Sequence, residues 1–154
     1  MTKLSFDVIH NLTGKTLATA ESCTGGGIGA ALTSVPGSSA VYKGGIISYT
    51  NAVKNALLNV STELLNREGA VSAPVAEAMA MGVRNALQAD TAVSVTGLAG
   101  PDGDDFGNPV GTVYIGYCDE KRCISKQFLF EGNREAVREQ ATNAALEIVL
   151  LYNK

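Results

Sequence analysis

The segment A-E-S-C-T-G-G, at residues 20–26, places Ser22, Cys23 and Thr24 directly before a run of glycines. Small, β-compatible residues precede this segment, and apolar residues at helical spacing follow it. At such a turn from strand to helix, free backbone N–H groups and the positive end of the helix dipole can hold a phosphate or stabilise an oxyanion. A plain helix cap, which is the alternative interpretation, needs only one of these three side chains. Their combination favours a functional site.

Lys54 lies about one helical turn after Tyr49, at the start of a predicted helix. The chain has a single histidine, His10, on a predicted amphipathic helix far from Ser22, so we expect a surface or packing role for it. If Lys54 is buried beside Ser22, desolvation and the helix dipole lower its pKa, and the neutral amine can remove the serine proton. An exposed surface lysine is the alternative. Ser22 and Lys54 are thus the one hydrolytic pair that this histidine-poor chain can assemble.

A second glycine-rich loop, residues 97–110, follows a predicted strand that ends at Thr96. Its glycines allow the backbone to approach a ligand closely, although a glycine-tolerant surface loop remains the alternative. Asp102, Asp104 and Asp105 lie in this loop, but their spacing does not match a calcium-binding EF-hand. We therefore predict no metal site here.

Arg134 and Arg138 lie four residues apart near the start of the last predicted helix. They can bind a phosphate group, or they can pair with neighbouring glutamates on the same helix. Both interpretations remain open for the two residues, and we assign Arg138 to substrate binding.

The composition restricts the class of protein. With 154 residues, 45% hydrophobic and 18% charged, the chain suits a single domain over residues 1–154. Its net charge of −3 disfavours nucleic acid and anionic membranes as partners. No apolar run is long enough to span a membrane, and the N-terminal segment does not resemble a signal peptide, so we expect a cytoplasmic protein. Three cysteines without a C-x-x-C motif predict neither a zinc site nor a disulfide framework.

The elements that must position these residues follow from periodicity and from turn and capping residues. Helices and strands intermix, which predicts an α/β fold, a three-layer α/β/α sandwich with a mixed sheet of about five or six strands. Because sites in such sheets lie at the carboxyl ends of strands, residues 21–27, 48–54 and 96–103 should converge on one cleft. Strands are expected at 16–20, 45–49, 91–96, 112–117 and 125–130, and helices at 4–12, 28–35, 51–58, 61–69, 72–87 and 134–151.

Taken together, several segments closely resemble the CinA C-terminal domain family, whose best-known activity is nicotinamide-nucleotide amidohydrolase. They are AESCTGG, GSSAVYKGGIISYTNAVK, GAVS, SVTGLAGPDG and NPVGTVYIGY. The resemblance covers roughly Phe6 to Leu151, in the family's order and spacing. It implies a three-layer domain that forms a homo-oligomer. It also implies hydrolysis of nicotinamide mononucleotide (NMN) to the nicotinate nucleotide and ammonia, without a metal or other cofactor.

The resemblance also implies roles for particular residues. The serine of the family's E-S-C-T-G-G motif corresponds to Ser22 as the nucleophile, and the lysine of Y-[ST]-N-x-x-K corresponds to Lys54 as the base. Tyr49 belongs to the same motif and is expected to orient Lys54 or the acyl group. Family members often carry lysine directly before P-V-G-T, where this chain has Asn108. The residues expected to bind substrate or the oxyanion are Thr24, Gly25, Gly26, Thr96, Gly97 and Gly100.

Two alternatives to this interpretation remain. The chain can be a paralogue that binds a nucleotide or a partner in the same cleft without turning it over, because a fold alone does not fix function. Alternatively Cys23 can be the nucleophile, since a helix N-terminus lowers the pKa of a thiol.

Overall fold

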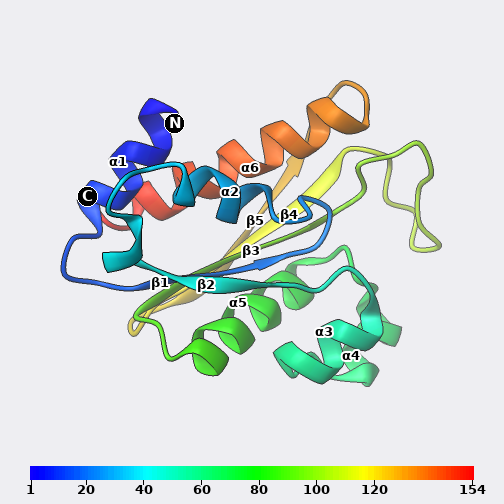
Figure 1. The fold of residues 1–154 in the computed structure, drawn as a ribbon. Helices are drawn as coiled ribbons and strands as arrows, with labels where there is room; N and C mark the ends of the chain where they lie inside the picture. Colours follow the sequence, from blue (N-terminus) through cyan, green and yellow to red (C-terminus); the bar gives the residue numbers. More distant parts are fainter.

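Five strands form one mixed sheet in the order β2-β1-β3-β4-β5 in the computed structural model, which describes residues 1–154. Strands β2, β1 and β3 are parallel, whereas β4 and β5 form an antiparallel hairpin beside β3. Helices α1, α2 and α6 cover one face of the sheet, and α3, α4 and α5 cover the other (Figure 1). The expected three-layer α/β/α sandwich is therefore confirmed.

The strands are β1 (Leu17–Glu21), β2 (Tyr42–Ile47), β3 (Thr91–Gly97), β4 (Thr112–Cys118) and β5 (Cys123–Leu129). The helices are α1 (Lys3–Asn11), α2 (Gly27–Thr33), α3 (Asn51–Leu58), α4 (Thr62–Glu68), α5 (Ala73–Leu87) and α6 (Arg134–Leu151), with a short 3-10 turn at Ser38–Ala40.

The sheet separates two hydrophobic cores. A cluster of 22 buried residues, including Val8, Leu32 and Val149, fills the space between the sheet and helices α1, α2 and α6. A second cluster of 10 buried residues, including Leu58 and Met79, lies under helices α3 to α5. Every residue of β1 is buried because both layers cover this central strand. None of the helices has the length and apolarity needed to cross a membrane.

All of the predicted helices and strands are present, and β2 shows the largest shift. We expected a strand at 45–49, but β2 begins at Tyr42 and ends at Ile47. Gly44 hid the start of this strand, because strands are depleted in glycine. Gly45 is required there, since a side chain at this position would collide with Thr19 of the neighbouring strand β1. As a result, Ser48 and Tyr49 lie beyond the strand, at the entrance to α3.

The cysteines of the hairpin correct a second expectation. The sequence predicted no disulfide, but the structure joins Cys118 and Cys123, whose Cα atoms lie 4.1 Å apart. The reason is the register of the hairpin: Asp119 and Arg122 close the turn, so the residues next to them face each other across β4 and β5. Cys23 remains a free, buried cysteine.

The topology opens a crevice at the carboxyl ends of β1 and β2. The chain leaves β1 toward α2 on one face of the sheet and leaves β2 toward α3 on the other face (Figure 1). Adjacent strands whose connections diverge in this way leave a gap between the two loops, which is where α/β proteins bind ligands. Ser22 follows β1, and Lys54 lies in the first turn of α3.

Candidate active site

The structure brings Ser22 and Lys54 together in this crevice. The Nζ atom of Lys54 lies 3.0 Å from Oγ of Ser22 and donates a hydrogen bond of 2.7 Å to the carbonyl oxygen of Ser48. Thr50 caps α3 by accepting a hydrogen bond from the N–H of Val53, which fixes the first turn of the helix that carries the lysine. Lys54 is only 1% exposed. The amine therefore reaches the serine from inside the protein rather than from solvent.

Burial changes the acid–base behaviour of Lys54. Removing the ammonium from water lowers its pKa from the ordinary value of 10.5 to about 8. No carboxylate pairs with this lysine to stabilise the charged form. In the neutral form, one N–H donates to the Ser48 carbonyl, and the lone pair can accept the hydroxyl proton of Ser22. The Ser48 N–H and hydroxyl both donate to the Glu21 carbonyl, at 2.7 and 3.2 Å, and this holds the Ser48 carbonyl in place.

Glu21 is a buried carboxylate that organises residues 22–26, the serine loop, between β1 and α2. Its Oε1 atom accepts hydrogen bonds from the Thr24 hydroxyl at 2.7 Å and from the N–H groups of Gly26 and Ile28 at 3.1 and 2.9 Å. Its Oε2 atom accepts the N–H of Gly29 at 3.1 Å. A carboxylate in this position pairs the free donors of the helix N-terminus and complements the helix dipole. These donors are consequently engaged within the protein.

This arrangement changes what the serine loop offers to a substrate. The sequence assigned Gly25 and Gly26 to an oxyanion or phosphate, but the Gly25 N–H donates to the Ser22 carbonyl and the Gly26 N–H to Glu21. The Thr24 hydroxyl is likewise engaged. By contrast, the backbone N–H groups of Cys23 and Thr24 have no protein acceptor. They directly follow Ser22 and are the donors available to a developing oxyanion.

The Cys23 thiol does not have the properties of a nucleophile. Burial raises its pKa to about 11, so the thiol stays protonated at neutral pH. The helix N-terminus, which we expected to lower this pKa, is already complemented by the Glu21 carboxylate.

Arg138 holds the serine loop. Its Nε atom donates to the Cys23 carbonyl at 3.0 Å, and its Nη2 atom donates to the Thr24 carbonyl at 3.3 Å. We assigned Arg138 to substrate binding, but the structure places it behind the loop and outside the cavity described below. It fixes the backbone directly after Ser22.

Arg134, rather than Arg138, lines the cavity. Its Nη1 atom donates to the Gly100 carbonyl at 2.7 Å, and its Nη2 atom donates to the Tyr49 hydroxyl at 3.0 Å. The Tyr49 side chain is 58% exposed and makes no hydrogen bond with Lys54. Arg134 therefore joins the second glycine loop to the segment after β2 across the mouth of the cavity.

The cavity in front of Ser22 has a volume of about 380 Å³. Several residues expected at the site line it together, namely Ser22, Lys54, Tyr49, Thr96, Gly97 and Gly100. The hydroxyl of Thr96 donates to the Ala70 carbonyl at 2.8 Å and thus positions another wall of the cavity. No group of three or more His, Cys, Asp or Glu side chains is arranged to hold a metal. The lining residues that the sequence did not assign include Asn51, Ala70, Val71, Asp102 and Arg134.

The sequence carried a signal for two residues that it did not assign to the site, Glu21 and Arg134. Glu21 is the one charged residue between Thr16 and Gly29, and a carboxylate within a few residues of a helix N-terminus can complement its dipole. Arg134 follows the cap residue Asn133 of α6, but the sequence does not show which of Arg134 and Arg138 faces the cavity.

Comparison with known proteins places the whole chain in one family. The model of the CinA C-terminal domain matches residues 2–152. A CinA-like protein from Thermosynechococcus vestitus is 51% identical over 138 residues, which cover 88% of this chain and 33% of that protein. A CinA-like protein from Geobacter sulfurreducens is 49% identical over 134 residues, 87% of this chain and 32% of that protein. The chain thus spans about a third of the length of these curated relatives.

Solved structures agree with this assignment. The competence/damage inducible protein CihA from Agrobacterium tumefaciens superposes with a TM-score of 0.95 at 38% identity, covering 99% of this chain and 94% of that chain. A competence or damage-inducible protein from Enterobacter asburiae superposes with a TM-score of 0.96 at 32% identity, covering 99% of this chain and 97% of that chain. With the fold, the motif residues and both comparisons in agreement, the chain belongs to the CinA C-terminal domain family.

Proposed function

We propose that this domain hydrolyses the carboxamide of NMN to nicotinate mononucleotide and ammonia through an ester of Ser22. The observation that carries the proposal is the buried Lys54 amine, 3.0 Å from Ser22 Oγ and without a carboxylate partner. With a pKa of about 8, roughly a tenth of this amine is neutral at pH 7, whereas an ordinary lysine is well under 1% neutral. Family membership and the motif residues support the same reaction class.

In the first half of the reaction, neutral Lys54 accepts the hydroxyl proton of Ser22 while Oγ forms a bond to the carboxamide carbon. The carbonyl π electrons move to oxygen, and the oxyanion accepts hydrogen bonds from the N–H groups of Cys23 and Thr24. The carbonyl then re-forms and the C–N bond breaks, with the Lys54 ammonium delivering its proton to the departing nitrogen. The products of this half are ammonia, the ester and neutral Lys54.

The second half uses the same groups with water. Lys54 accepts a proton from water as the hydroxide oxygen adds to the ester carbon. When the tetrahedral intermediate collapses, the Ser22–carbon bond breaks, and Lys54 returns the proton to Oγ. The carboxylic acid formed in this way loses its remaining proton to solvent and leaves as the carboxylate, and the site is restored. The cationic pyridinium ring aids both additions by withdrawing electrons from the carbonyl carbon.

The charged residues in the cavity wall favour a substrate that carries both a positive and a negative charge. Lys54 and Arg134 are the only cationic residues that line it, and Asp102 is the only anionic one. We assign the phosphate of NMN to the Arg134 side, because a guanidinium binds phosphate oxygens in pairs. Asn108, where relatives often carry lysine, is engaged by the Val71 carbonyl and the Asp104 carboxylate, so it adds no cation. We therefore expect weaker NMN affinity than in members with that lysine.

Ammonia release from NMN by the purified protein tests the proposal. We expect Ser22→Ala and Lys54→Met to lower kcat at least about a thousandfold, as loss of a nucleophile or its base does in serine hydrolases. Ser34→Ala and Lys43→Met, at exposed positions away from the cavity, are matched controls and should keep the wild-type rate. Equal rates for the wild type and Ser22→Ala would exclude the serine mechanism.

A thermal-shift series with NMN separates the alternatives. Stabilisation by NMN without ammonia release would indicate the binding paralogue, with an intact cleft and no turnover. The ammonia-release assay also tests the cysteine alternative. Since the Cys23 thiol stays protonated, we expect Cys23→Ala to retain activity within a few fold, and its complete loss would favour the thiol.

A further inference from the structure

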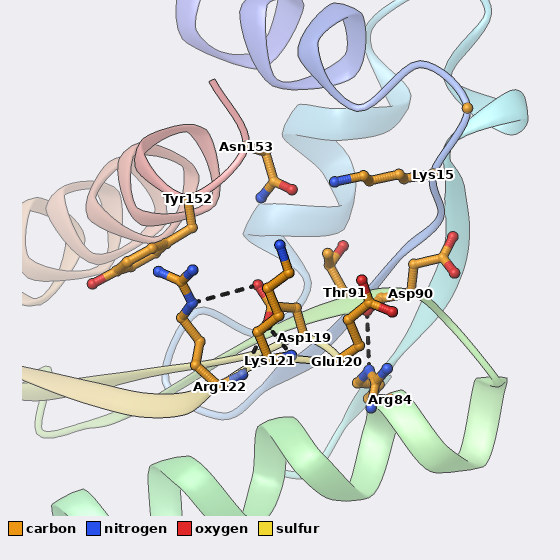
Figure 2. Close-up of a pocket in the computed structure, with 11 residues that line it drawn as sticks. Lys15, Arg84, Asp90, Thr91, Asp119, Glu120, Lys121, Arg122, Tyr152 and Asn153 are labelled. Atoms are coloured by element: carbon orange, nitrogen blue, oxygen red, sulfur yellow. Dashed lines mark hydrogen bonds and ion pairs between the residues drawn. The ribbon is translucent and has the colours of Figure 1, made fainter.

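A second hollow lies at the opposite end of the sheet, where β1 and β3 begin (Figure 2). Its volume is about 200 Å³, and none of its lining residues belongs to the candidate active site. Strand β1 separates the two sites by roughly 20 Å, given about 3.3 Å per residue. Four cationic side chains reach this hollow from separate parts of the fold: Lys15 before β1, Arg84 on α5, and Lys121 and Arg122 in the β4–β5 hairpin.

Most of the donors on these side chains are unused. The amino groups of Lys15 and Lys121 make no hydrogen bond or ion pair with the protein, and both point toward Asn153 (Figure 2). Arg84 uses only Nε, which donates to the Asp90 carbonyl at 3.0 Å. The Nε atom of Arg122 lies 3.8 Å from the Asp119 carboxylate, and its guanidinium lies over the Tyr152 ring, 4.9 Å from the centroid. The Nη atoms of both guanidinium groups are without a protein acceptor.

The nearby carboxylates are, by contrast, largely engaged within the protein. Asp90 accepts hydrogen bonds from the N–H and hydroxyl of Thr16, at 2.8 and 3.1 Å. Asp119 accepts the Tyr117 hydroxyl at 3.0 Å and two backbone N–H groups of its own turn. Only Glu120, an exposed residue at the tip of the turn, has no hydrogen-bonding partner. The hollow thus presents free cationic donors, while two of its three acids are already paired.

A structural role explains part of this cluster. Gly14 and Asn153 line the hollow just beyond the C-terminal ends of α1 and α6, where a cation is favourable. One cation at each helix end would satisfy that role. The cluster has four cations, in a chain whose net charge is −3.

We propose that this hollow binds a small molecule that carries a phosphate group, held by Lys15 and Lys121 with the free Nη atoms of Arg84. Guanidinium forks and ammonium groups are the side chains that proteins use for phosphate oxygens. The volume accommodates a phosphate with a small substituent. This proposal is independent of the reaction at Ser22.

Titration calorimetry with inorganic pyrophosphate tests the proposal, using an Arg134→Met background so that the candidate active site does not contribute. We expect saturable binding that Lys15→Met with Lys121→Met weakens at least about tenfold, which corresponds to about 1.4 kcal/mol. The double variant Lys43→Met with Lys126→Met removes the same charge elsewhere on the surface and should bind as before. Glu120→Gln, which removes the unpaired acid, should bind more tightly.

Amide NMR spectra during the same titration give the location, with the largest shifts expected at Gly14 and Asn153. Both lysines are exposed, so the variants should fold, and thermal melting without ligand verifies this. Absence of saturable binding would overturn the proposal. Equal binding by the pocket and control double variants would also overturn it, and would show that these cations serve only the helix ends.

Discussion

At the scale of single residues, the pKa of Lys54 sets the expected pH dependence of the reaction. In the proposed reaction the neutral amine is the base, so activity should rise with pH. The pKa of about 8 in the folded protein places the midpoint near pH 8. We expect kcat/KM for NMN to increase about tenfold per pH unit below pH 7.5 and to level off above pH 9.

Steady-state rates measured between pH 6.5 and 9.5 at constant ionic strength check this expectation. The lower limit lies above the second ionisation of the substrate phosphate, near pH 6. A profile that is flat across this range would contradict the assignment of Lys54 as the base.

The same burial has a cost in stability. Between pH 8 and about 10.4 the unfolded chain holds a proton on Lys54 that the folded protein has lost, so stability rises with pH in this window. Below pH 8 the folded protein bears the full free-energy cost of burying the charged Lys54 amine. We therefore expect Lys54→Met to raise the free energy of unfolding at pH 7 by about 1–3 kcal/mol.

Urea denaturation of Lys54→Met and the wild type at pH 7 and pH 10 checks this prediction. The difference should shrink at pH 10, where the wild-type amine is neutral in the folded protein. Ser22→Ala serves as the control, because it removes activity without removing a buried amine. Lower stability of Lys54→Met at pH 7 would show that its two hydrogen bonds outweigh its desolvation.

Residue types and spacing predicted the pairing of Ser22 with Lys54, since both residues belong to motifs at the carboxyl ends of strands. The choice between Arg134 and Arg138 was not predictable. The two residues are four apart and share one face of α6, so the choice depends on where each turn of the helix lies along the sheet edge. That position is set by packing against the sheet and not by the local sequence.

At the scale of elements, the Glu21 carboxylate joins the end of β1 to the start of α2. It is 2% exposed and accepts three backbone N–H groups and one hydroxyl. Glu21→Gln keeps the size but removes the charge and one acceptor oxygen. We expect a loss of roughly 2–3 kcal/mol in stability and a lower kcat, because the Ser22 loop loses its support.

Chemical denaturation and NMN turnover of the Gln variant check this prediction. Glu63→Gln, at an exposed carboxylate in the first turn of α4, is the matched control and should change stability by less than about 1 kcal/mol. If both variants lose equally little stability, Glu21 is not the support of the serine loop that the geometry indicates.

Most element boundaries were predictable because capping residues mark them. Ser61 and Asn133 each accept a backbone N–H at a helix start, as expected from their types. The start of β2 and the Cys118–Cys123 pair were not predictable from the sequence, since both depend on contacts between strands. Glycine is required at position 45 by the close approach of Thr19, and the two cysteines are brought together by the register of the hairpin.

At the scale of the whole molecule, the central strands should be the most stable part of the fold. Strands β1 and β3 lie inside the sheet, and both hydrophobic cores pack against them. Loop 98–111 has few backbone hydrogen bonds and mostly exposed residues. We expect native-state hydrogen exchange to be slowest in β1 and β3 and fastest in this loop. Equal protection of the loop and β1 would contradict this expectation.

The serine and the lysine of the candidate site belong to opposite layers of the sandwich. Ser22 follows β1 and leads into α2 on one face, whereas Lys54 belongs to α3 on the other. Their 3.0 Å contact forms only when both helical layers are docked on the sheet. A partly folded chain with one layer in place would contain every reactive group and catalyse nothing. In the proposed reaction, ammonia release from NMN therefore requires both helical layers, and a refolding chain should regain it only after both have docked.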